Sequence, residues 1–181
     1  MKVIAKPMEG LVLLEVPVFS DDRGFFLESY NQNNFNNLGI PFHFVQDNLS
    51  NSKKGVLRGL HFQAPPFDQG KLVRVLRGAV LDVVVDIRQS SPTYGKYFKV
   101  ELSENNFLAL FIPPGFAHGF VALQENTLFQ YKCTNYYHKA SEMGLMWNDP
   151  DLAIDWEINA PLLSDKDRVY GAFRDFVTVF P

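Results

Sequence analysis

The sequence predicts an all-β fold, a sandwich or a barrel, and three observations support this prediction. Short runs rich in Val, Leu and Phe recur at regular spacing, each bounded by turn residues. Few segments show the 3.6-residue apolar period of an amphipathic helix. Seventeen of the 181 residues are Phe, and aromatic residues reach 14%. Such a composition suits a tightly filled barrel or a site that stacks on a flat ligand.

The first fifty residues are expected to hold three strands and one helix. Residues 21–24 (Asp-Asp-Arg-Gly) form a turn, because Asp and Gly favour turn conformations. A short helix is expected over 33–38, since Gly39 can close it and Pro41 prevents its extension. The strands expected in this part of the chain are residues 11–18, 25–30 and 42–48.

Seven further strands are expected at regular spacing before residue 135. They cover residues 56–63, 71–77, 79–88, 97–102, 107–112, 118–123 and 127–134. Past Pro150 the pattern weakens, which predicts loops and short helices packed on the barrel. No repeat or linker interrupts the chain, so we expect one domain spanning residues 1–181.

The strand expected over 79–88 has two unlike faces. Leu81, Val83 and Val85 share an apolar face, whereas Asp82 and Asp86 lie on the other. A face with carboxylates usually lies against water, but in a small barrel it can line a ligand cavity. We therefore expect Asp82 and Asp86 to line the barrel or to have a structural role.

Charge and cysteine content narrow the class of protein. The net charge of −3 and the lack of a Lys/Arg-rich run argue against nucleic-acid binding. No apolar run is long enough to span a membrane or to serve as a secretion signal. Cys133 is the only cysteine, which rules out an intramolecular disulfide. These features predict a cytoplasmic protein.

The most informative stretches are residues 55–63 and 69–75, which place His61, Arg58 and Lys71 on two otherwise apolar strands. Charged groups on such strands are costly unless they are paired or face a wet cavity. A cavity holding an imidazole and an ammonium can remove a proton from carbon and stabilise the resulting oxyanion. The sequence therefore predicts a catalytic cavity at these strands.

Strict alternation along 56–63 gives His61 and Arg58 opposite faces. On this pattern His61 shares a face with Leu57, Gly59 and Gln63. Gly59 is a natural site for a β-bulge, which would re-aim one of the two charged side chains.

Eight short motifs follow one another over most of the chain, from about residue 18 to residue 167. They are Gln46–Asn48 (QDN), Gly55–Gln63 (GVLRGLHFQ), Gln69–Val75 (QGKLVRV), Asp82–Arg88 (DVVVDIR), Ser91–Gly95 (SPTYG), Ile112–Phe120 (IPPGFAHGF), Trp147–Pro150 (WNDP) and Leu163–Asp167 (LSDKD). Each motif is weak by itself, but together and in this order they resemble the dTDP-4-dehydrorhamnose 3,5-epimerase family.

The resemblance implies a fold, a reaction and a partner. The expected fold is a cupin-type jelly-roll barrel with short peripheral helices, working as a homodimer. The expected substrate is the dTDP-sugar dTDP-4-keto-6-deoxyglucose, inverted at C3 and C5 without a metal or a redox cofactor. Rhamnose biosynthesis for cell-surface polysaccharide is the usual setting. The N-terminal segment, about residues 1–50, is expected to contact the partner subunit.

The resemblance assigns the chemistry to four side chains. His61 corresponds to the base, and a near-neutral imidazole suits removal of a proton next to a ketone. Asp167 corresponds to the carboxylate that pairs with this histidine, and Asp165 is the competing candidate. Lys71 corresponds to the donor that stabilises the enolate oxygen. Tyr131 corresponds to the acid on the opposite face of the sugar, which inversion requires.

Further positions match residues that bind substrate in the family. A planar Arg58 guanidinium suits the diphosphate. Phe19 and Tyr137 would sandwich a thymine ring, and Trp147 either joins them or belongs to the core. The full set of expected binding residues is Phe19, Arg23, Glu28, Gln46, Asn48, Arg58, His118 and Tyr137. Because the N-terminal segment crosses over in this family, Arg23 and Glu28 are expected to complete the partner's site.

His118 ends a Pro-x-Gly-x-x-His pattern shared with cupins at large, in many of which this histidine binds a metal. A metal site needs about three protein ligands. Here the neighbouring strand offers only His61, followed by Phe62 and Gln63. The metal interpretation is therefore weakened, and His118 is expected to hold the substrate or the region around Lys71.

Three alternatives remain at the level of sequence. The first is an epimerase of one carbon or a ketoisomerase of related sugars. The second is a metal-dependent cupin oxygenase or isomerase. The third is a non-catalytic barrel that binds a sugar nucleotide or a protein. A complete set of His, Asp, Lys and Tyr argues against the third, because a binding protein needs neither a base nor an acid.

Overall fold

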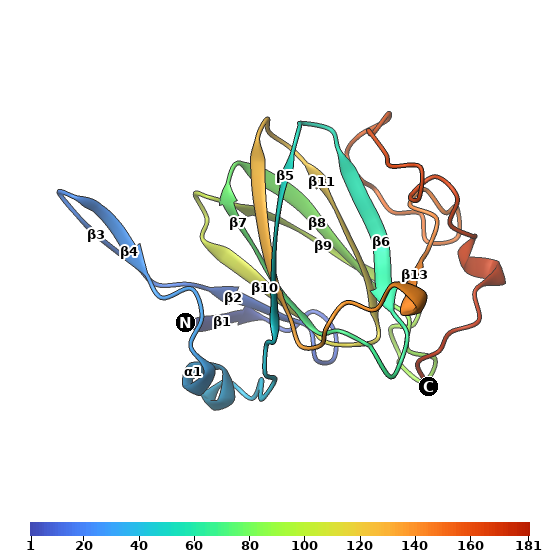
Figure 1. The fold of residues 1–181 in the computed structure, drawn as a ribbon, viewed down its shortest axis with the longest axis horizontal. Helices are drawn as coiled ribbons and strands as arrows, with labels where there is room; N and C mark the ends of the chain where they lie inside the picture. The colour runs from blue at the N-terminus through green and yellow to red at the C-terminus, as the bar shows by residue number, and fades with distance from the viewer.

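Two antiparallel sheets stacked face to face form the body of the structure, a computed structural model that describes residues 1–181 (Figure 1). The six-stranded sheet has the order β1 (Lys2–Ala5), β2 (Val12–Glu15), β10 (Leu108–Ile112), β7 (Lys71–Arg77), β12 (Thr127–Cys133) and β5 (Gln46–Ser52). The five-stranded sheet has the order β13 (Glu142–Gly144), β6 (Leu57–Gln63), β11 (Phe116–Ala122), β8 (Ala79–Asp86) and β9 (Tyr97–Ser103). This architecture confirms the predicted cupin-type jelly roll.

Apolar side chains from both sheets meet in the space between them. Val73, Leu110 and Phe129 of the six-stranded sheet pack with Val84 and Phe120 of the five-stranded sheet. Burying one such side chain stabilises the fold by about 1.5–3 kcal/mol. This core fixes the distance between the sheets, and hence the width of any cavity that opens between them.

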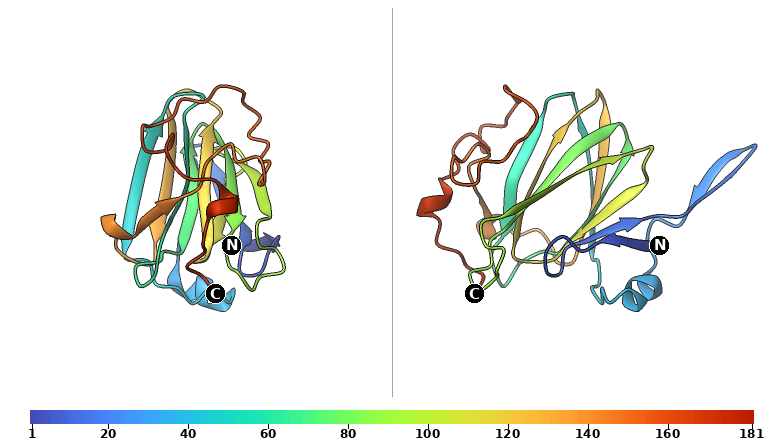
Figure 2. Two further views of the ribbon diagram at one scale, coloured as in Figure 1. Left: turned by 90° about the vertical axis from the view of Figure 1, so that its right-hand side faces the viewer. Right: turned by 180° about the vertical axis from the view of Figure 1, so that it is seen from behind.

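The outer face of each sheet is covered by a different end of the chain. The C-terminal segment covers the five-stranded sheet, where Trp156 and Phe180 pack with Leu81 (Figure 2). The helix α1 (Gln32–Asn37) and the residues after it cover the six-stranded sheet, where Phe35 packs with Phe111. Two short 3₁₀ helices, η1 (Lys139–Ser141) and η2 (Phe173–Asp175), complete the fold. None of the helices has the length and apolar character needed to cross a membrane.

A β-hairpin formed by β3 (Val18–Asp21) and β4 (Gly24–Leu27) projects from the body of the molecule (Figure 1). The turn predicted over 21–24 joins the two strands. Three aromatic side chains of this arm are exposed: Phe19 by 64%, Phe25 by 62% and Phe26 by 68%. An arm of this kind buries little of its own apolar surface, which is typical of a segment that docks elsewhere.

The expected strands agree with the structure except near the N-terminus and at one short strand that follows β12. The strand expected over 11–18 is split around Pro17, which has no N–H to donate to a ladder. The strand expected over 42–48 lies at Gln46–Ser52 instead, because Phe42 and Phe44 pack beside α1 outside the sheet. The strands β1 and β13 were not expected, since runs of four and three residues carry too little pattern.

The strand β8 is buried on both faces, so the carboxylates on it do not lie against water. Leu81, Val83 and Val85 pack under the C-terminal segment. The opposite face points between the sheets, where Asp82 and Asp86 are fully buried. Asp86 binds Arg88 at 2.7 Å and has a structural role at the end of the barrel.

Candidate active site

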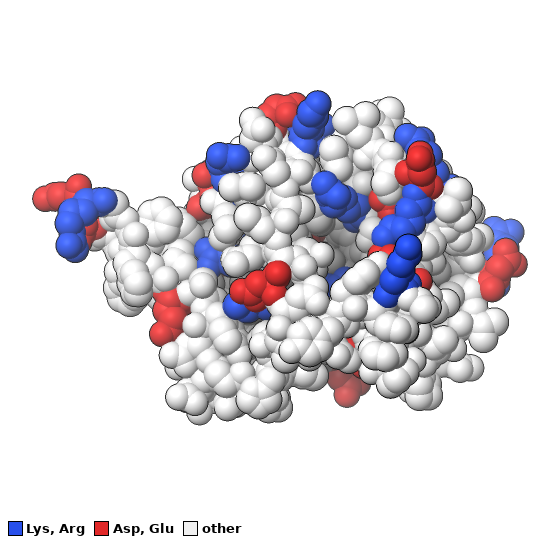
Figure 3. All heavy atoms as spheres, in the orientation of Figure 1, with Lys and Arg blue, Asp and Glu red and all other residues white.

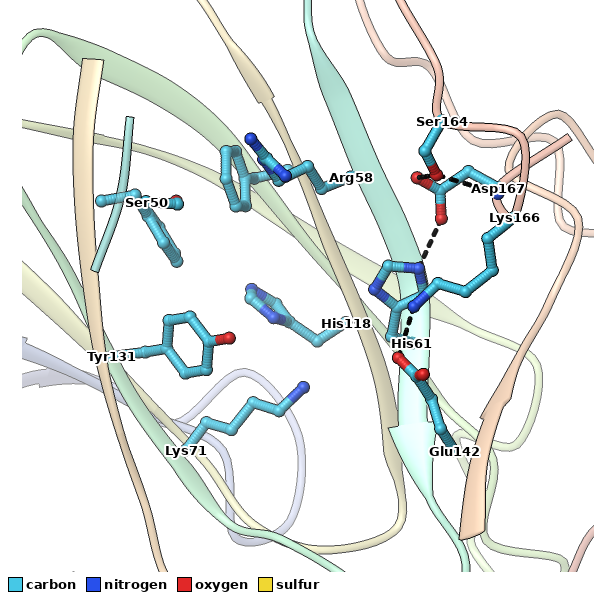
Figure 4. A pocket seen from close by; sticks show the side chains of 12 residues that line it. Ser50, Arg58, His61, Lys71, His118, Tyr131, Glu142, Ser164, Lys166 and Asp167 are labelled. Atoms are coloured by element: carbon cyan, nitrogen blue, oxygen red, sulfur yellow. Dashed lines mark hydrogen bonds and ion pairs between the residues drawn. The ribbon is translucent and has the colours of Figure 1, made fainter. Parts of the chain in front are cut away.

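A cavity of about 260 Å³ opens between the two sheets on the side away from β9 and beneath the C-terminal segment (Figure 4). The six-stranded sheet supplies Lys71 and Tyr131, and the five-stranded sheet supplies His61 and Arg58. The complete lining is Ser50, Arg58, His61, Lys71, His118, Phe120, Phe129, Tyr131, Glu142, Ser164, Lys166 and Asp167. The cavity therefore brings together all four side chains that the sequence assigned to catalysis.

A bulge in β6 brings Arg58 and His61 to the same face. His61 pairs with His118 and Arg58 pairs with Phe120, so two residues of β6 lie opposite Gly119 alone. Gly59 is one of these two residues, and a Cβ built on it would lie 2.4 Å from the Cα of Gly119. Only glycine fits at so close an approach of two backbones.

The bulge corrects two expectations from strict alternation. Arg58 was expected on the face opposite His61, but both side chains line the cavity. Leu57 was expected beside His61, but it packs with Leu81 on the outer face of the sheet. The extra residue reverses the alternation of inward and outward side chains on one side of the bulge. This agrees with the expectation from the sequence that Gly59 is a natural site for a bulge that re-aims one of the two charged side chains.

His61 is held by a buried carboxylate. Its Nε2 donates to Oδ1 of Asp167 at 2.5 Å, and Asp167 is only 3% exposed. The hydroxyl of Ser164 donates to the other carboxylate oxygen at 2.8 Å. Of the two candidate aspartates, the structure therefore pairs Asp167, and not Asp165, with the histidine. This contact directs Nδ1, the other ring nitrogen, into the cavity (Figure 4).

Burial sets the protonation states of this pair. Burial, helped by the positive charges of Lys166 and Lys71, lowers the pKa of His61 by more than the hydrogen bond and charge of Asp167 raise it, so the pKa lies below 6.5. Burial alone would raise the pKa of Asp167, but the hydrogen bond and charge of His61, the hydrogen bond of Ser164 and the charge of Lys166 together outweigh burial, and the pKa falls below its usual value. At neutral pH the pair is a neutral imidazole beside a carboxylate, the form in which Nδ1 can accept a proton.

Tyr131 and Lys71 enter the cavity from the sheet opposite His61 (Figure 4). Burial raises the pKa of the Tyr131 phenol, so it stays protonated at neutral pH and can donate a proton. Burial lowers the pKa of Lys71, and the nearby Cys133 and Asp82 oppose this shift. The cavity thus has a proton acceptor on one wall and a proton donor on the other.

A second histidine and aspartate pair lies at the back of the cavity. Nε2 of His118 contacts the two carboxylate oxygens of Asp82 at 3.1 and 2.9 Å. Both residues are buried, and burial raises the pKa of Asp82. His118 on β11 pairs directly with His61 on the neighbouring strand β6. No group of three His, Cys, Asp or Glu side chains in the structure is arranged to hold a metal ion.

An adjoining hollow of about 230 Å³ extends the cavity toward the loop that follows β12. Gln46, Asn48 and Tyr137, three of the expected binding residues, line this hollow. It shares His61, Lys71, Tyr131 and Glu142 with the first cavity. The two spaces therefore adjoin at these four side chains.

The structure adds two charged residues that sequence reasoning missed. Nζ of Lys166 lies 2.5 Å from Oε1 of Glu142, and the phenol of Tyr137 donates to Oε2 of Glu142 at 3.0 Å. These linked polar contacts of Lys166, Glu142 and Tyr137 lie along the mouth of the cavity, where Figure 3 shows basic side chains beside a hollow in the surface. Lys166 could have been found in the sequence, because it stands next to Asp167 in the LSDKD motif. Glu142 carries no such signal.

Three expected binding residues lie outside the cavity of their own chain. Phe19 and Arg23 lie on the projecting hairpin, where Arg23 pairs with Asp21 at 2.5 Å (Figure 1). Glu28 accepts hydrogen bonds from the amides of Asn31 and Asn34, at the start of α1.

Trp147 belongs to the core rather than to the cavity. It packs at the edge of the apolar cluster beneath the C-terminal segment, and its carbonyl accepts a hydrogen bond from the indole of Trp156 at 2.7 Å. Of the two interpretations left open by the sequence, the structure supports the core.

Comparison with known proteins matches nearly the whole chain. The family model described as dTDP-4-dehydrorhamnose 3,5-epimerase matches residues 5–175. The dTDP-4-dehydrorhamnose 3,5-epimerase of Escherichia coli is 54% identical over 170 residues, covering 93% of this chain and 92% of that protein.

Two solved structures with nucleotide ligands have a similar fold. The epimerase of Legionella pneumophila in complex with dTDP-4-keto-L-rhamnose has a TM-score of 0.95 at 45% identity, covering 99% of this chain and 97% of its own. The Bacillus anthracis enzyme with TDP and pyrophosphate bound has a TM-score of 0.94 at 46% identity, covering 95% of this chain and 99% of its own.

Proposed function

The chain belongs to the dTDP-4-dehydrorhamnose 3,5-epimerase family, and on that premise we propose that His61, Lys71 and Tyr131 carry out the epimerisation in the cavity described above. The substrate is dTDP-4-keto-6-deoxyglucose, which is inverted at C3 and C5. One observation carries this proposal: an imidazole and a phenol enter one cavity from opposite sheets, with an ammonium beside them (Figure 4). Both carbons adjoin the C4 ketone, so each can lose a proton to give an enolate.

His61 is the base in this proposal. Its Nε2–H is engaged by Asp167, which leaves the lone pair of Nδ1 free to remove the proton from C3 or C5. The carboxylate also stabilises the imidazolium that forms, because a charged hydrogen bond strengthens as its donor becomes cationic. The electron pair of the broken C–H bond passes to the C4 oxygen.

Lys71 stabilises that oxygen. A donor aimed at a developing oxyanion in a water-poor site lowers the barrier by several kcal/mol, removal of one such donor costing roughly 2.7–4 kcal/mol. Lys71 lies on β7 beside β12, so its ammonium reaches the same space as the phenol of Tyr131. His118 stands on the opposite sheet as a further donor or acceptor for the sugar.

Tyr131 is the acid. Inversion requires that the new proton reach the carbon from the face opposite the one the old proton left. Tyr131 and His61 stand on opposite walls, which meets this requirement for a sugar ring lying between them (Figure 4). Each inversion removes one proton and returns one, so the reaction changes no oxidation state, and we propose that it uses no cofactor.

The nucleotide occupies the part of the cavity that runs toward β5. We propose that Arg58 contacts the diphosphate, and that Gln46, Asn48 and Tyr137 contact the nucleoside. Arg58 is free to do so, since its Nε donates to Ser52 at 3.2 Å while the rest of its guanidinium faces the cavity (Figure 4). Tyr137 is 53% exposed, which leaves a ring face available for stacking on thymine.

We also propose that the protein is a homodimer whose hairpins complete each other's sites. Phe19 and Arg23 stand on an arm that does not reach the cavity of its own chain (Figures 1 and 2). Exposed Phe25 and Phe26 on the same arm give a partner subunit apolar surface to cover. With one buried cysteine and no disulfide, we place the protein in the cytoplasm.

Incubation with dTDP-4-keto-6-deoxyglucose in heavy water tests this function. We expect deuterium at both C3 and C5, read by NMR, and a product inverted at both carbons. Deuterium at C3 alone would indicate a single-carbon epimerase instead. His61→Ala should abolish exchange at both positions, and normal exchange in this variant would refute the assignment of the base.

A further inference from the structure

Gln63 is a buried amide whose hydrogen bonds all go to the backbone of two loops. It ends β6, two residues after His61, and is 6% exposed. Its Nε2 donates to the carbonyls of Phe67 at 2.6 Å and Tyr136 at 3.3 Å. Its Oε1 accepts the N–H of His138 at 2.7 Å. Both amide protons are therefore engaged, although the side chain borders the hollow next to the catalytic cavity.

These bonds bracket Tyr137. Gln63 holds the carbonyl of the residue before it and the N–H of the residue after it. The N–H of Tyr137 itself donates to Oε1 of Gln46 at 2.9 Å. Side chains from strands of both sheets thus hold the backbone on either side of this tyrosine.

The other anchors of the loop are hydrogen bonds at its two ends: the carbonyl of Asn135 accepts from Gln69 at 2.7 Å, and Nδ1 of His138 contacts the hydroxyl of Ser141 at 2.8 Å. Tyr136 and Tyr137 are 66% and 53% exposed, so apolar burial contributes little to their placement. The one aromatic contact of the loop is the ring of His138 stacked on the ring of Phe67, with 3.9 Å between the ring centroids. Gln63 binds the carbonyl of Phe67 as well, so the same amide fixes both partners of that stack.

Gln63 is connected to the catalytic base, His61, through the pairing of β6 with β13. Gln63 pairs in register with Glu142, and His61 pairs with Gly144, across β6 and β13. Glu142 in turn accepts from the phenol of Tyr137 at 3.0 Å. The distance between the base and Tyr137 is therefore set by a closed ring of contacts that passes through Gln63.

We propose that Gln63 is a positioning residue, which fixes Tyr137 at the nucleotide end of the cavity relative to His61. The amide touches no substrate; it acts through the loop it holds. The inference rests on the proposed function, since it takes Tyr137 as a contact for the thymidine diphosphate. It assigns Gln63 an effect on nucleotide affinity and not on proton transfer.

The test compares Gln63→Met, which keeps the volume but removes the amide, with Gln124→Met, a matched change at an exposed glutamine. We expect Gln63→Met to raise KM for the dTDP-sugar and Kd for dTDP, measured by calorimetry, about tenfold each, the effect of losing one or two neutral hydrogen bonds. We expect kcat to stay within about threefold, because His61, Lys71 and Tyr131 are untouched. Gln124→Met should match the wild type.

A double-mutant cycle shows whether the effect passes through Tyr137. In a Tyr137→Ala background, Gln63→Met should weaken dTDP binding less than about twofold further, because the ring that it positions is gone. Additive losses would overturn the inference, as would unchanged dTDP affinity in Gln63→Met or a fall in kcat alone. If the Met variant does not fold, Gln63→Asn, which keeps an amide but is too short to reach both loops, is expected to show the same loss.

The outcomes separate this inference from the function on which it rests. A wild-type protein that binds no dTDP would overturn both. Equal dTDP binding by the wild type and by a folded Gln63→Met variant would overturn the positioning role alone and leave the epimerase intact.

Discussion

Replacing Asp167 with Asn tests the pair that holds His61. The substitution keeps the shape of the side chain but exchanges a carboxylate for an amide 2.5 Å from Nε2 of the histidine. An amide that donates to Nε2 forces the ring proton onto Nδ1, the nitrogen that faces the cavity (Figure 4). The imidazole would then present a donor where the reaction needs an acceptor.

Two effects set the size of the loss. A hydrogen bond to a charged group contributes about 1.5–3 kcal/mol, which corresponds to roughly 10- to 150-fold in rate. The wrong tautomer adds to this, and the corresponding Asp-to-Asn change in a serine protease triad costs about 10⁴-fold in kcat. We therefore expect Asp167→Asn to lower the exchange of substrate hydrogens with heavy water by about 10²- to 10⁴-fold.

The assay is the initial rate of deuterium incorporation at C3 and C5, followed by NMR at saturating substrate. Ser164→Ala is the matched control, since it removes only the hydroxyl that donates to the other carboxylate oxygen, and should cost less than about tenfold. An Asp167→Asn variant that folds and exchanges within threefold of the wild type would refute the reasoning.

The same pair predicts the acid limb of the pH profile. The pKa of His61 lies below 6.5, so activity should fall as pH drops through that lower value and the imidazole takes up a proton. An apparent pKa above 6.5 for the acid limb, in a plot of kcat/KM against pH, would contradict the effect of burial on this histidine.

Three further predictions concern the acid, the bulge and the stability of the barrel. Tyr131→Phe should still exchange the substrate hydrogens with solvent through His61, but its rate of inversion should fall by about 10²- to 10⁴-fold. The measurement compares the rate of epimer formation with the rate of deuterium uptake, and an equal loss of both rates would contradict the role of Tyr131 as the acid. Gly59→Ala places a Cβ 2.4 Å from the Cα of Gly119, so the free energy of unfolding, measured in urea, should fall by more than about 3 kcal/mol. An unfolding midpoint in urea equal to that of the wild type would contradict the close approach of these two backbones. Asp86 has a pKa of about 2 against an ordinary 3.8, so it stabilises the fold by about 2 kcal/mol above pH 4, and this is lost as pH falls through about 2; Asp86→Asn should show a flatter pH dependence over that range.

Most of the strands that build the cavity were predictable because their pattern is local. The bounds of β7 and the start of β8 follow from runs of branched apolar residues between turns. The strand β5 was misplaced by four residues because its inward face is polar, with Gln46, Asn48 and Ser50 lining the site. A strand that serves a ligand on one face does not carry the apolar alternation by which strands are recognised.

The sequence by itself determined the strands and the kinds of side chain on them: a histidine, a lysine and an arginine on apolar runs, where charge needs a partner or a cavity. The tertiary structure alone decided which face Arg58 takes, because a bulge depends on how closely Gly59 approaches Gly119 on another strand. It also decided that Asp167 rather than Asp165 reaches His61, 106 residues away in the chain. Contacts between distant segments are fixed by packing, and no local pattern records them.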